Sequence, residues 1–429
     1  MKSSLLFALV LAGLRAPAAD IPPLVLLEGV GVNIHFSRGH EQDLDLIAAA
    51  GFKFIRMDFS WSGIERNKGE YDWSAYDELT ANLEKRKLRP FYILDYSNNL
   101  YEDEVSSRDP VSGKERLGTA SPQKPESIAA FARWAAGAVK HFQGHRIIWE
   151  IWNEPNINFW KPKPDVKQYI ALVQATVPAM RAVDPEATIV APASSGFPWD
   201  FLEELFKSGA LEGLDAVSVH PYRNYKQGPE TAAEDYARLR ALIAQYAPPG
   251  RKQIPILSGE WGYATHVKGG VSLETQAAFI ARQQLANLLN GVPLSIWYDW
   301  KNDGLDPKET EHNFGTVTPD LKPKPAYLAI QTLARELAGY RIARRHSVSN
   351  DQDYVLLLVN GDGAFKLAAW TLGEPHTISL DLGNASAVEI PVVSGDGNAG
   401  KVSIQNGRFN LELSSTPKYV TLGSLSLKK

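Results

Sequence analysis

Short β-rich runs alternate with helical patterns along most of this sequence, from about residue 27 to residue 337. The predicted strands are 31–36, 52–59, 90–96, 147–153, 188–194, 216–222, 254–259 and 294–300. A helical pattern follows each strand, as in 125–142, where apolar residues recur at helical spacing. Parallel strands need such a connecting segment between each pair. The alternation therefore predicts an α/β fold, a closed (β/α)8 TIM barrel.

An open doubly wound sheet is the alternative with the same alternation. That fold usually carries a glycine-rich turn directly after its first strand. Gly29 and Gly31 precede His35 here without forming such a turn. The barrel is therefore the favoured fold, and we assign it residues 19–338.

The pattern changes after about residue 340, where strand-like runs continue without any helical period. Turn signals such as Asn360-Gly361 and Asn406-Gly407 separate several of these runs. We predict an antiparallel β-sandwich over residues 339–429. Its expected role is to brace the barrel, and sugar binding is the alternative.

The N-terminus is typical of a signal peptide. Lys2 is followed by an apolar run at 5–14, which is too short to span a bilayer, and Ala16 and Ala18 offer small residues for cleavage. We assign residues 1–18 to this signal, with an uncleaved anchor as the alternative. The prediction is an exported protein, periplasmic or secreted, with no integral membrane segment in the mature chain.

Composition excludes several classes of function. The formal net charge is −4 and no long basic run occurs, so nucleic acid is not an expected partner. The chain has no cysteine, which removes thiolate chemistry and cysteine metal sites. His312, Asp303 and Glu311 lie close in sequence, but their spacing matches no metal-ligand pattern. We expect no metal, no cofactor and a monomer.

Chemically useful side chains gather at the ends of four predicted strands, where barrel enzymes keep their active sites. They are Asn153 and Glu154 on the fourth strand, His220 and Tyr222 on the sixth, Glu260 on the seventh and Trp300 on the eighth. Two carboxyl groups that flank one sugar are the requirement for cleaving a glycosidic bond. The sequence therefore predicts that Glu154 and Glu260 form this pair.

The two carboxyl groups must differ in protonation, because one donates a proton and the other attacks as an anion. Arg56, at the end of the second strand, is the candidate for keeping Glu260 ionised, with a structural ion pair as the alternative. Glu150 lies on the same strand face as Glu154 and is the competing acid. The position of Glu154 nearer the barrel rim favours Glu154.

Several motifs resemble those of clan A glycoside hydrolases. The segments are 149–156 (WEIWNEPN), 258–262 (SGEWG), 219–222 (VHPY), 322–327 (KPKPAY), 70–76 (EYDWSAY) and 93–96 (ILDY). The first two resemble the acid/base and nucleophile motifs of the clan, the next two resemble family 39, and the last two look most like PslG-type endoglycosidases that degrade bacterial exopolysaccharide. The resemblance implies a retaining mechanism with Glu154 as acid/base, Glu260 as nucleophile and Asn153 on the sugar 2-hydroxyl.

Further residues are candidates for binding the carbohydrate substrate. They are Arg56, His220, Tyr222, Trp160, Trp300 and Asn302, each with core packing or structural pairing as the alternative. Trp297 and Trp300 are three apart and should face opposite sides of a strand, and we favour Trp300 for the sugar.

The expected function is endo-acting cleavage of a β-linked polysaccharide that binds in an open cleft between barrel loops. One alternative is an exo-acting, β-xylosidase-like enzyme with a closed pocket. Another is a carbohydrate-binding barrel without activity, although the presence of both glutamates argues against it.

Overall fold

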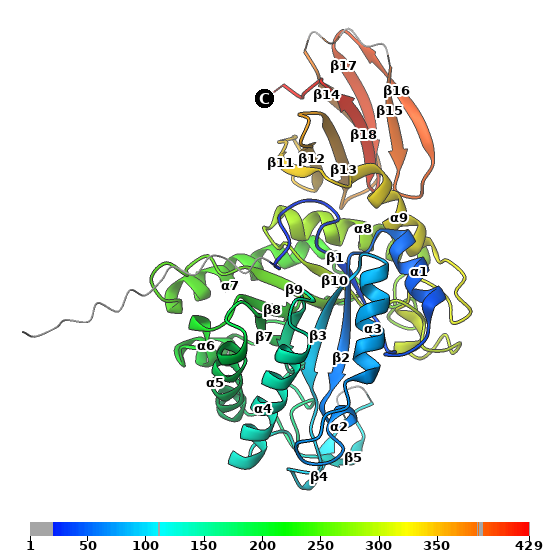
Figure 1. Cartoon of the computed structure of the whole chain (residues 1–429). Helices are drawn as coiled ribbons and strands as arrows, with labels where there is room; N and C mark the ends of the chain where they lie inside the picture. The colour runs from blue at the N-terminus through cyan, green and yellow to red at the C-terminus, as the bar shows by residue number, and fades with distance from the viewer. Residues whose placement is uncertain (1–19, 110–111, 384, 386–388, 429) are drawn as a thin grey trace, which may run out of the picture.

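The computed structural model describes residues 20–109, 112–383, 385 and 389–428. Within them, parallel strands close into a barrel in the order β1-β10-β9-β8-β7-β6-β3-β2 (Figure 1). Their bounds are β1 Val30–Asn33, β2 Phe54–Ser60, β3 Arg89–Asp95, β6 Ile148–Ile151, β7 Thr188–Ser195, β8 Ala216–His220, β9 Ile256–Trp261 and β10 Ser295–Trp297. The predicted TIM barrel is confirmed. The predicted signal peptide lies outside the described residues.

Helices follow the barrel strands, as the alternation predicts. They are α1 Glu41–Ala50, α2 Trp61–Ile64, α3 Ser74–Lys85, α4 Pro125–His141, α5 Val166–Val183, α6 Trp199–Lys207, α7 Ala233–Tyr246, α8 Leu273–Leu289 and α9 Pro325–Leu337. Asp165 caps α5, because its carboxylate accepts from the backbone N–H groups of Lys167 and Gln168. In the described part of the chain, every helix is too short or too polar to cross a bilayer.

Apolar side chains from the barrel strands pack together inside the barrel. They are Phe54, Phe91, Ile148, Val190, Ala216, Leu257, Leu294 and Ile296. Side chains on a strand alternate between the two faces, so Arg56, Glu150 and Ser218, each two residues further along, share the interior. The interior therefore changes from apolar to polar towards the carboxyl ends of the strands.

The C-terminal residues form an antiparallel sheet in the order β11-β12-β13-β18-β15-β16-β17-β14. The strands are β11 Arg341–Arg345, β12 Asp353–Val359, β13 Phe365–Thr371, β14 His376–Asp381, β15 Glu389–Ser394, β16 Ala399–Gln405, β17 Arg408–Leu413 and β18 Lys418–Gly423. Strand β16 pairs with β15 and, beyond Ser403, with β17, so the sheet bends over a core of its own. The predicted antiparallel domain is confirmed, with β11 as a strand that the sequence did not indicate.

The strands β12, β13 and β18 of this accessory sheet are buried on both faces. Val355, Leu357 and Leu367 face the sheet's own core. Leu356, Leu358, Ala368, Trp370 and Tyr419, at the alternate positions, join the barrel's outer core. Figure 1 places the sheet beside α8 and α9, at the opposite end of the molecule from the hairpin of β4 (Glu104–Arg108) and β5 (Glu115–Thr119).

A buried ion pair joins the sheet to the barrel. The guanidinium of Arg282 donates to both oxygens of Glu230, at 2.8 and 2.7 Å. Trp370 of β13 donates its indole N–H to the same carboxylate at 2.8 Å. Since Arg282 and Glu230 are both buried, each needs the other to compensate its lost hydration.

We expect Glu230→Ala to destabilise the folded protein by about 3–5 kcal/mol, because it leaves a buried guanidinium and a buried indole N–H unpaired. Urea denaturation measures the loss. Glu234→Ala, at an exposed position of α7, is the matched control and should change the free energy of unfolding by less than about 0.5 kcal/mol. Equal losses in the two variants would contradict the role of the ion pair.

Candidate active site

The fold brings Glu154 and Glu260 together at the carboxyl ends of the barrel strands. Glu154 follows β6, and Glu260 belongs to β9. One carboxylate oxygen from each glutamate and one ring nitrogen of His220 all lie within 4.8 Å of one another. Two acids that are far apart in the sequence are thus close enough to act on one bound molecule.

The backbone turns sharply where strand β6 ends. The predicted strand 147–153 stops at Ile151, and Trp152 and Glu154 take left-handed φ values of 71° and 48°. Such values are uncommon for residues other than glycine and cost free energy. The Glu154 N–H donates to the carbonyl of Ala193 at 2.9 Å, which holds the turn against β7. This conformation directs the Glu154 side chain to His220.

Both oxygens of Glu260 accept hydrogen bonds. Arg56 Nη1 donates to Oε2 at 2.6 Å, and the hydroxyl of Tyr222 donates to Oε1 at 2.8 Å. Hydrogen bonds from a cation and a hydroxyl stabilise negative charge on a carboxylate. Arg56 and Tyr222 therefore hold the Glu260 side chain in one orientation, beside a positive charge, where it lines the pocket.

Arg56 is a buried hub whose hydrogen-bonding capacity is fully used. Its five N–H groups have acceptors in Glu150 (2.8 Å), Glu260 (2.6 Å), Asn33 (3.2 Å), Asn153 (2.8 Å) and His220 (3.3 Å). Burial alone would lower its pKa, but the carboxylates of Glu150 and Glu260 raise the pKa of Arg56 well above its usual range. The competing acid Glu150 is thus a buried counter-ion of Arg56.

Glu154 has a different environment from Glu260. Burial raises the pKa of its carboxyl group to about 7, against the opposing effects of a hydrogen bond with Ser195 and the charge of Arg56. His220 Nδ1 lies 2.8 Å from Oε1 of Glu154. Arginine only donates, so the contact with Arg56 makes His220 Nε2 an acceptor and leaves the proton on Nδ1. His220 thus donates to Glu154.

His220 remains neutral in this position. Burial lowers the pKa of the imidazole to about 4. The ring is fully buried and does not line the cavity, so the expectation that His220 contacts the sugar is corrected. Its place behind Glu154 makes it a positioning residue.

A cavity of about 480 Å³ opens in front of the two glutamates. Of the predicted residues, Arg56, Asn153, Glu154, Tyr222 and Glu260 line it. Sequence reasoning missed Asn33, His35, Asp58, Tyr96, Phe159, Ser195, Tyr298, Glu311 and Phe314. Strand period could have found Asp58, which lies two residues after Arg56 on β2.

Trp160, Trp300 and Asn302 lie away from this cavity, which corrects the expectation that they bind sugar. Trp160 is fully buried, and its indole donates to Gln168 at 2.9 Å. Trp300 is also buried and donates to Asp43 at 2.9 Å.

Asn302 instead accepts from Lys324 at 3.2 Å. Strand β10 ends at Trp297, so its alternation does not extend to Trp300. Tyr298, directly after the strand, faces the cavity instead.

Two groups of side chains have metal-ligand spacing among the described residues. One is Glu154, His220 and Glu260, whose ligand atoms already have hydrogen-bond partners. The other is His35, Asp299 and Asp303, in which His35 pairs with Asp299 at 3.4 Å. The expectation of no metal therefore stays a prediction.

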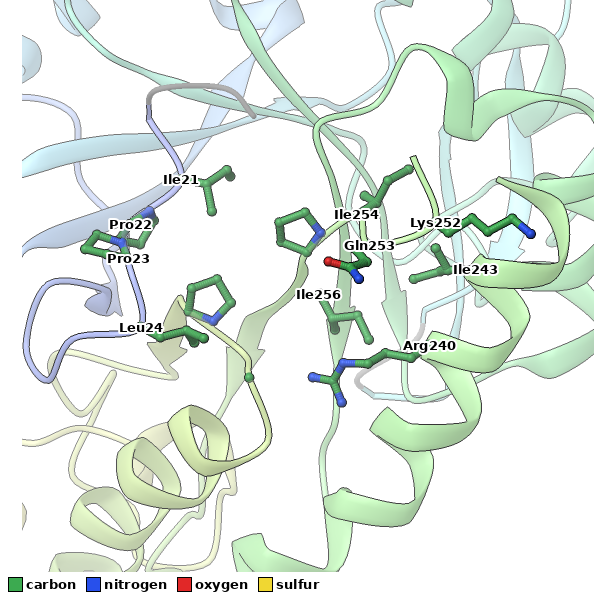
Figure 2. A pocket seen from close by; sticks show the side chains of 13 residues that line it. Ile21, Pro22, Pro23, Leu24, Arg240, Ile243, Lys252, Gln253, Ile254 and Ile256 are labelled. Atoms are coloured by element: carbon green, nitrogen blue, oxygen red, sulfur yellow. The ribbon is translucent and has the colours of Figure 1, made fainter. Parts of the chain in front are cut away.

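A larger cavity, of about 750 Å³, lies at the other end of the barrel (Figure 2). Residues 21–24, Arg240 and Ile243 of α7 and the segment 252–256 line it, together with Pro293. Among the described residues around it, none carries a carboxylate. The smaller cavity is thus the candidate active site.

A (β/α)8 barrel with two glutamates together at its carboxyl end has the architecture of a clan A glycoside hydrolase. The sequence model of the family "Cellulase (glycosyl hydrolase family 5)" matches residues 25–304. The chain therefore belongs to the cellulase family, glycosyl hydrolase family 5. Its clan A character, expected from the motifs, is confirmed.

The chain is also similar to individual glycosidases. A β-xylosidase from Geobacillus stearothermophilus is 28% identical over 204 residues, which are 42% of this chain and 40% of that protein. The chain thus aligns with less than half the length of this relative.

Solved structures are similar over nearly the whole chain. A family 39 glycoside hydrolase from Bacteroides cellulosilyticus is 25% identical with a TM-score of 0.77, covering 94% of this chain and 81% of that one. A family 39 β-xylosidase from Caulobacter crescentus is 19% identical with a TM-score of 0.66, covering 95% and 98%, and shows the fold alone. The resemblance to family 39 thus has structural counterparts.

Proposed function

We propose that this chain is a retaining β-glycosidase that acts by double displacement. The observation that carries the proposal is the spacing of Glu154 and Glu260, which have oxygens within 4.8 Å of each other. Retaining glycosidases hold their carboxyl groups about 5–5.5 Å apart, whereas inverting enzymes leave about 6.5–9.5 Å for a water molecule. The observed spacing favours direct attack by a carboxylate.

The environments of the two acids fit the two roles. Glu154 is protonated below a pH of about 7 and donates its proton to the leaving oxygen, while the Glu260 carboxylate attacks the anomeric carbon. Glycosylation of Glu260 then removes its negative charge. Glu154, now deprotonated, accepts a proton from the water that releases the sugar. Asn153, which donates to Tyr96 at 2.9 Å, has a second amide hydrogen for the sugar 2-hydroxyl.

Product stereochemistry tests this proposal. We expect the first product released from a β-glycoside to be the β anomer, because two displacements restore the configuration. Proton NMR in the first minutes of reaction distinguishes the anomers before mutarotation mixes them. An initial α anomer would mean inversion and would contradict the nucleophilic role of Glu260.

The pocket favours a neutral sugar. Arg56 has no N–H group left for a substrate carboxylate, and His35 is paired with Asp299. The similarity to curated β-xylosidases supports a pentoside and exo action. Endo action on a polysaccharide is the second candidate, and the paired rings of Tyr96 and Phe159 offer a surface on which sugar rings can stack.

A panel of polysaccharides with product sizing separates these candidates. Release of monosaccharide supports exo action, and release of oligomers supports endo action. Bacterial exopolysaccharide belongs in the panel because segments 70–76 and 93–96 resemble PslG-type enzymes. We also propose that the protein is exported after cleavage near residue 18, which N-terminal sequencing of the exported form would test.

A further inference from the structure

Asp58 is a pocket carboxylate that lacks an ordinary hydrogen-bond donor. It lies on β2, two residues after Arg56, and lines the same cavity as both glutamates. Among the described residues, no N–H group or hydroxyl donates to its side chain; burial raises the pKa of this carboxyl group, and the neighbouring carboxyl group of Asp95 is among the groups that lower it. Its side chain is half-buried, so part of it faces the cavity. A half-buried anion with unused lone pairs needs donors from whatever fills the pocket.

Asp95 lies behind it in a more extreme environment. It is the last residue of β3 and is fully buried. Neither of its oxygens receives a hydrogen bond from an N–H group or a hydroxyl of the described chain. When two carboxyl groups lie close together in a buried site, repulsion between their charges favours protonation of one of them. Burial, and then the charge of Asp58, raise the pKa of Asp95 far above its usual range, so the proton resides on Asp95.

The cationic side chains near Asp58 already have other partners. All five N–H groups of Arg56 donate to other acceptors, and His35 pairs with Asp299 at 3.4 Å. The pair of aspartates therefore does not serve as a counter-ion for a protein side chain in direct contact. A sugar bound beside Glu260 brings several hydroxyl donors into this cavity.

We propose that Asp58 is a specificity-determining residue that accepts a hydrogen bond from a ring hydroxyl of the sugar next to Glu260, and that Asp95, as a neutral acid donating to Asp58, is its positioning residue. This inference rests on the proposed glycosidase function. It adds to that function a carboxylate that favours sugars with a hydroxyl at one ring position over sugars that lack this hydroxyl.

Deoxy substrates test the role of Asp58. The probe is the 4-nitrophenyl β-glycoside that the wild-type protein cleaves fastest, beginning with the β-D-xylopyranoside, together with its 2-, 3- and 4-deoxy analogues. We expect Asp58→Ala to lower kcat/KM on the parent by about 10- to 150-fold, the range for a lost hydrogen bond to a charged group. One deoxy analogue should be nearly insensitive to the substitution, because it lacks the hydroxyl that Asp58 binds.

A uniform loss on all analogues, or no loss on the parent, would overturn the assignment of Asp58. Wild-type turnover of the parent measures the proposed function separately. A wild-type protein that cleaves no β-glycoside would contradict the glycosidase proposal itself and remove the basis of this inference.

Paired substitutions test the role of Asp95. Asp95→Asn keeps an N–H donor for Asp58, and Asp95→Leu has a similar size without any donor. We expect Asp95→Leu to raise KM on the parent glycoside about tenfold or more with a smaller effect on kcat, and Asp95→Asn to restore most of that affinity. Equal KM values in the two variants, at equal melting temperatures, would overturn the positioning role.

Discussion

We expect that replacing Glu260 by alanine lowers kcat on a β-glycoside by about 10⁴-fold or more, because it removes the carboxylate that we propose attacks the anomeric carbon. Hydrogen bonds from Arg56, at 2.6 Å, and from Tyr222, at 2.8 Å, orient the Glu260 carboxylate. Arg56 keeps Glu150 as a counter-ion in the variant, so the barrel should still fold. Initial rates on 4-nitrophenyl β-glycosides measure the loss, and circular dichroism checks the fold.

Azide distinguishes a lost nucleophile from general damage. In Glu260→Ala, azide can enter the space of the missing carboxylate and attack an activated aryl glycoside, which gives the α-glycosyl azide. Glu309→Ala, an exposed glutamate in the loop after β10, is the control and should retain wild-type rates without azide. Formation of the β-glycosyl azide by Glu260→Ala, or activity near that of the wild type, would overturn the nucleophile assignment.

The sequence predicts those parts of the molecule that depend on periodicity. Alternating strand and helix patterns predict a parallel sheet, the lack of a glycine-rich turn after the first strand favours a closed barrel, and closure places all carboxyl ends of the strands at the same rim. Glu154 and Glu260 therefore meet although neither is near the other in sequence. Tyr222 also follows from the end of a strand and Arg56 from the inward face of β2, and both contact Glu260.

Side chains beyond a strand's end depend on packing that no local pattern encodes. Trp300 follows β10 by three residues, and its indole turns to Asp43 in the outer core. Trp160 packs against Trp152 with ring centroids 5.0 Å apart. An aromatic residue in a loop carries the same sequence signal whether it stacks on sugar or fills a core, and only the fold decides.

The loop residues of the cavity could not be found from the sequence for the same reason. Phe159, Glu311 and Phe314 line the pocket from connections between strands and helices. Their positions depend on how those connections fold back over the barrel. The hairpin β4–β5 likewise lies in a stretch, 97–120, that reads as a long loop.

The pH dependence of the reaction should report the ionisation of Glu154. Burial raises the pKa of this carboxyl group to about 7. The acid role needs the protonated form, which predominates below that pH and is lost above it. We therefore expect kcat/KM on an unactivated β-glycoside to fall about tenfold per pH unit above pH 7. Initial rates between pH 5 and pH 9 measure this limb.

Glu154→Gln should remove the alkaline limb and lower kcat/KM on an unactivated substrate by about 10²–10⁴-fold, the usual contribution of a general acid. An aryl glycoside with a good leaving group departs without protonation, so its first step should lose much less. Parallel assays of a β-linked disaccharide and a 4-nitrophenyl β-glycoside give this comparison.

Azide also tests the role of Glu154 as the base, because the second step needs a base only when water attacks the sugar. In Glu154→Ala, azide attacks the sugar on Glu260 without base assistance, from the face opposite that bond. The product is the β-glycosyl azide, of opposite configuration to the product of Glu260→Ala. Equal losses on disaccharide and aryl substrates would contradict the acid role of Glu154, and so would an alkaline limb that persists in Glu154→Gln. His220 cannot cause that limb, because burial lowers the pKa of its imidazole to about 4, below the pH range of the assay.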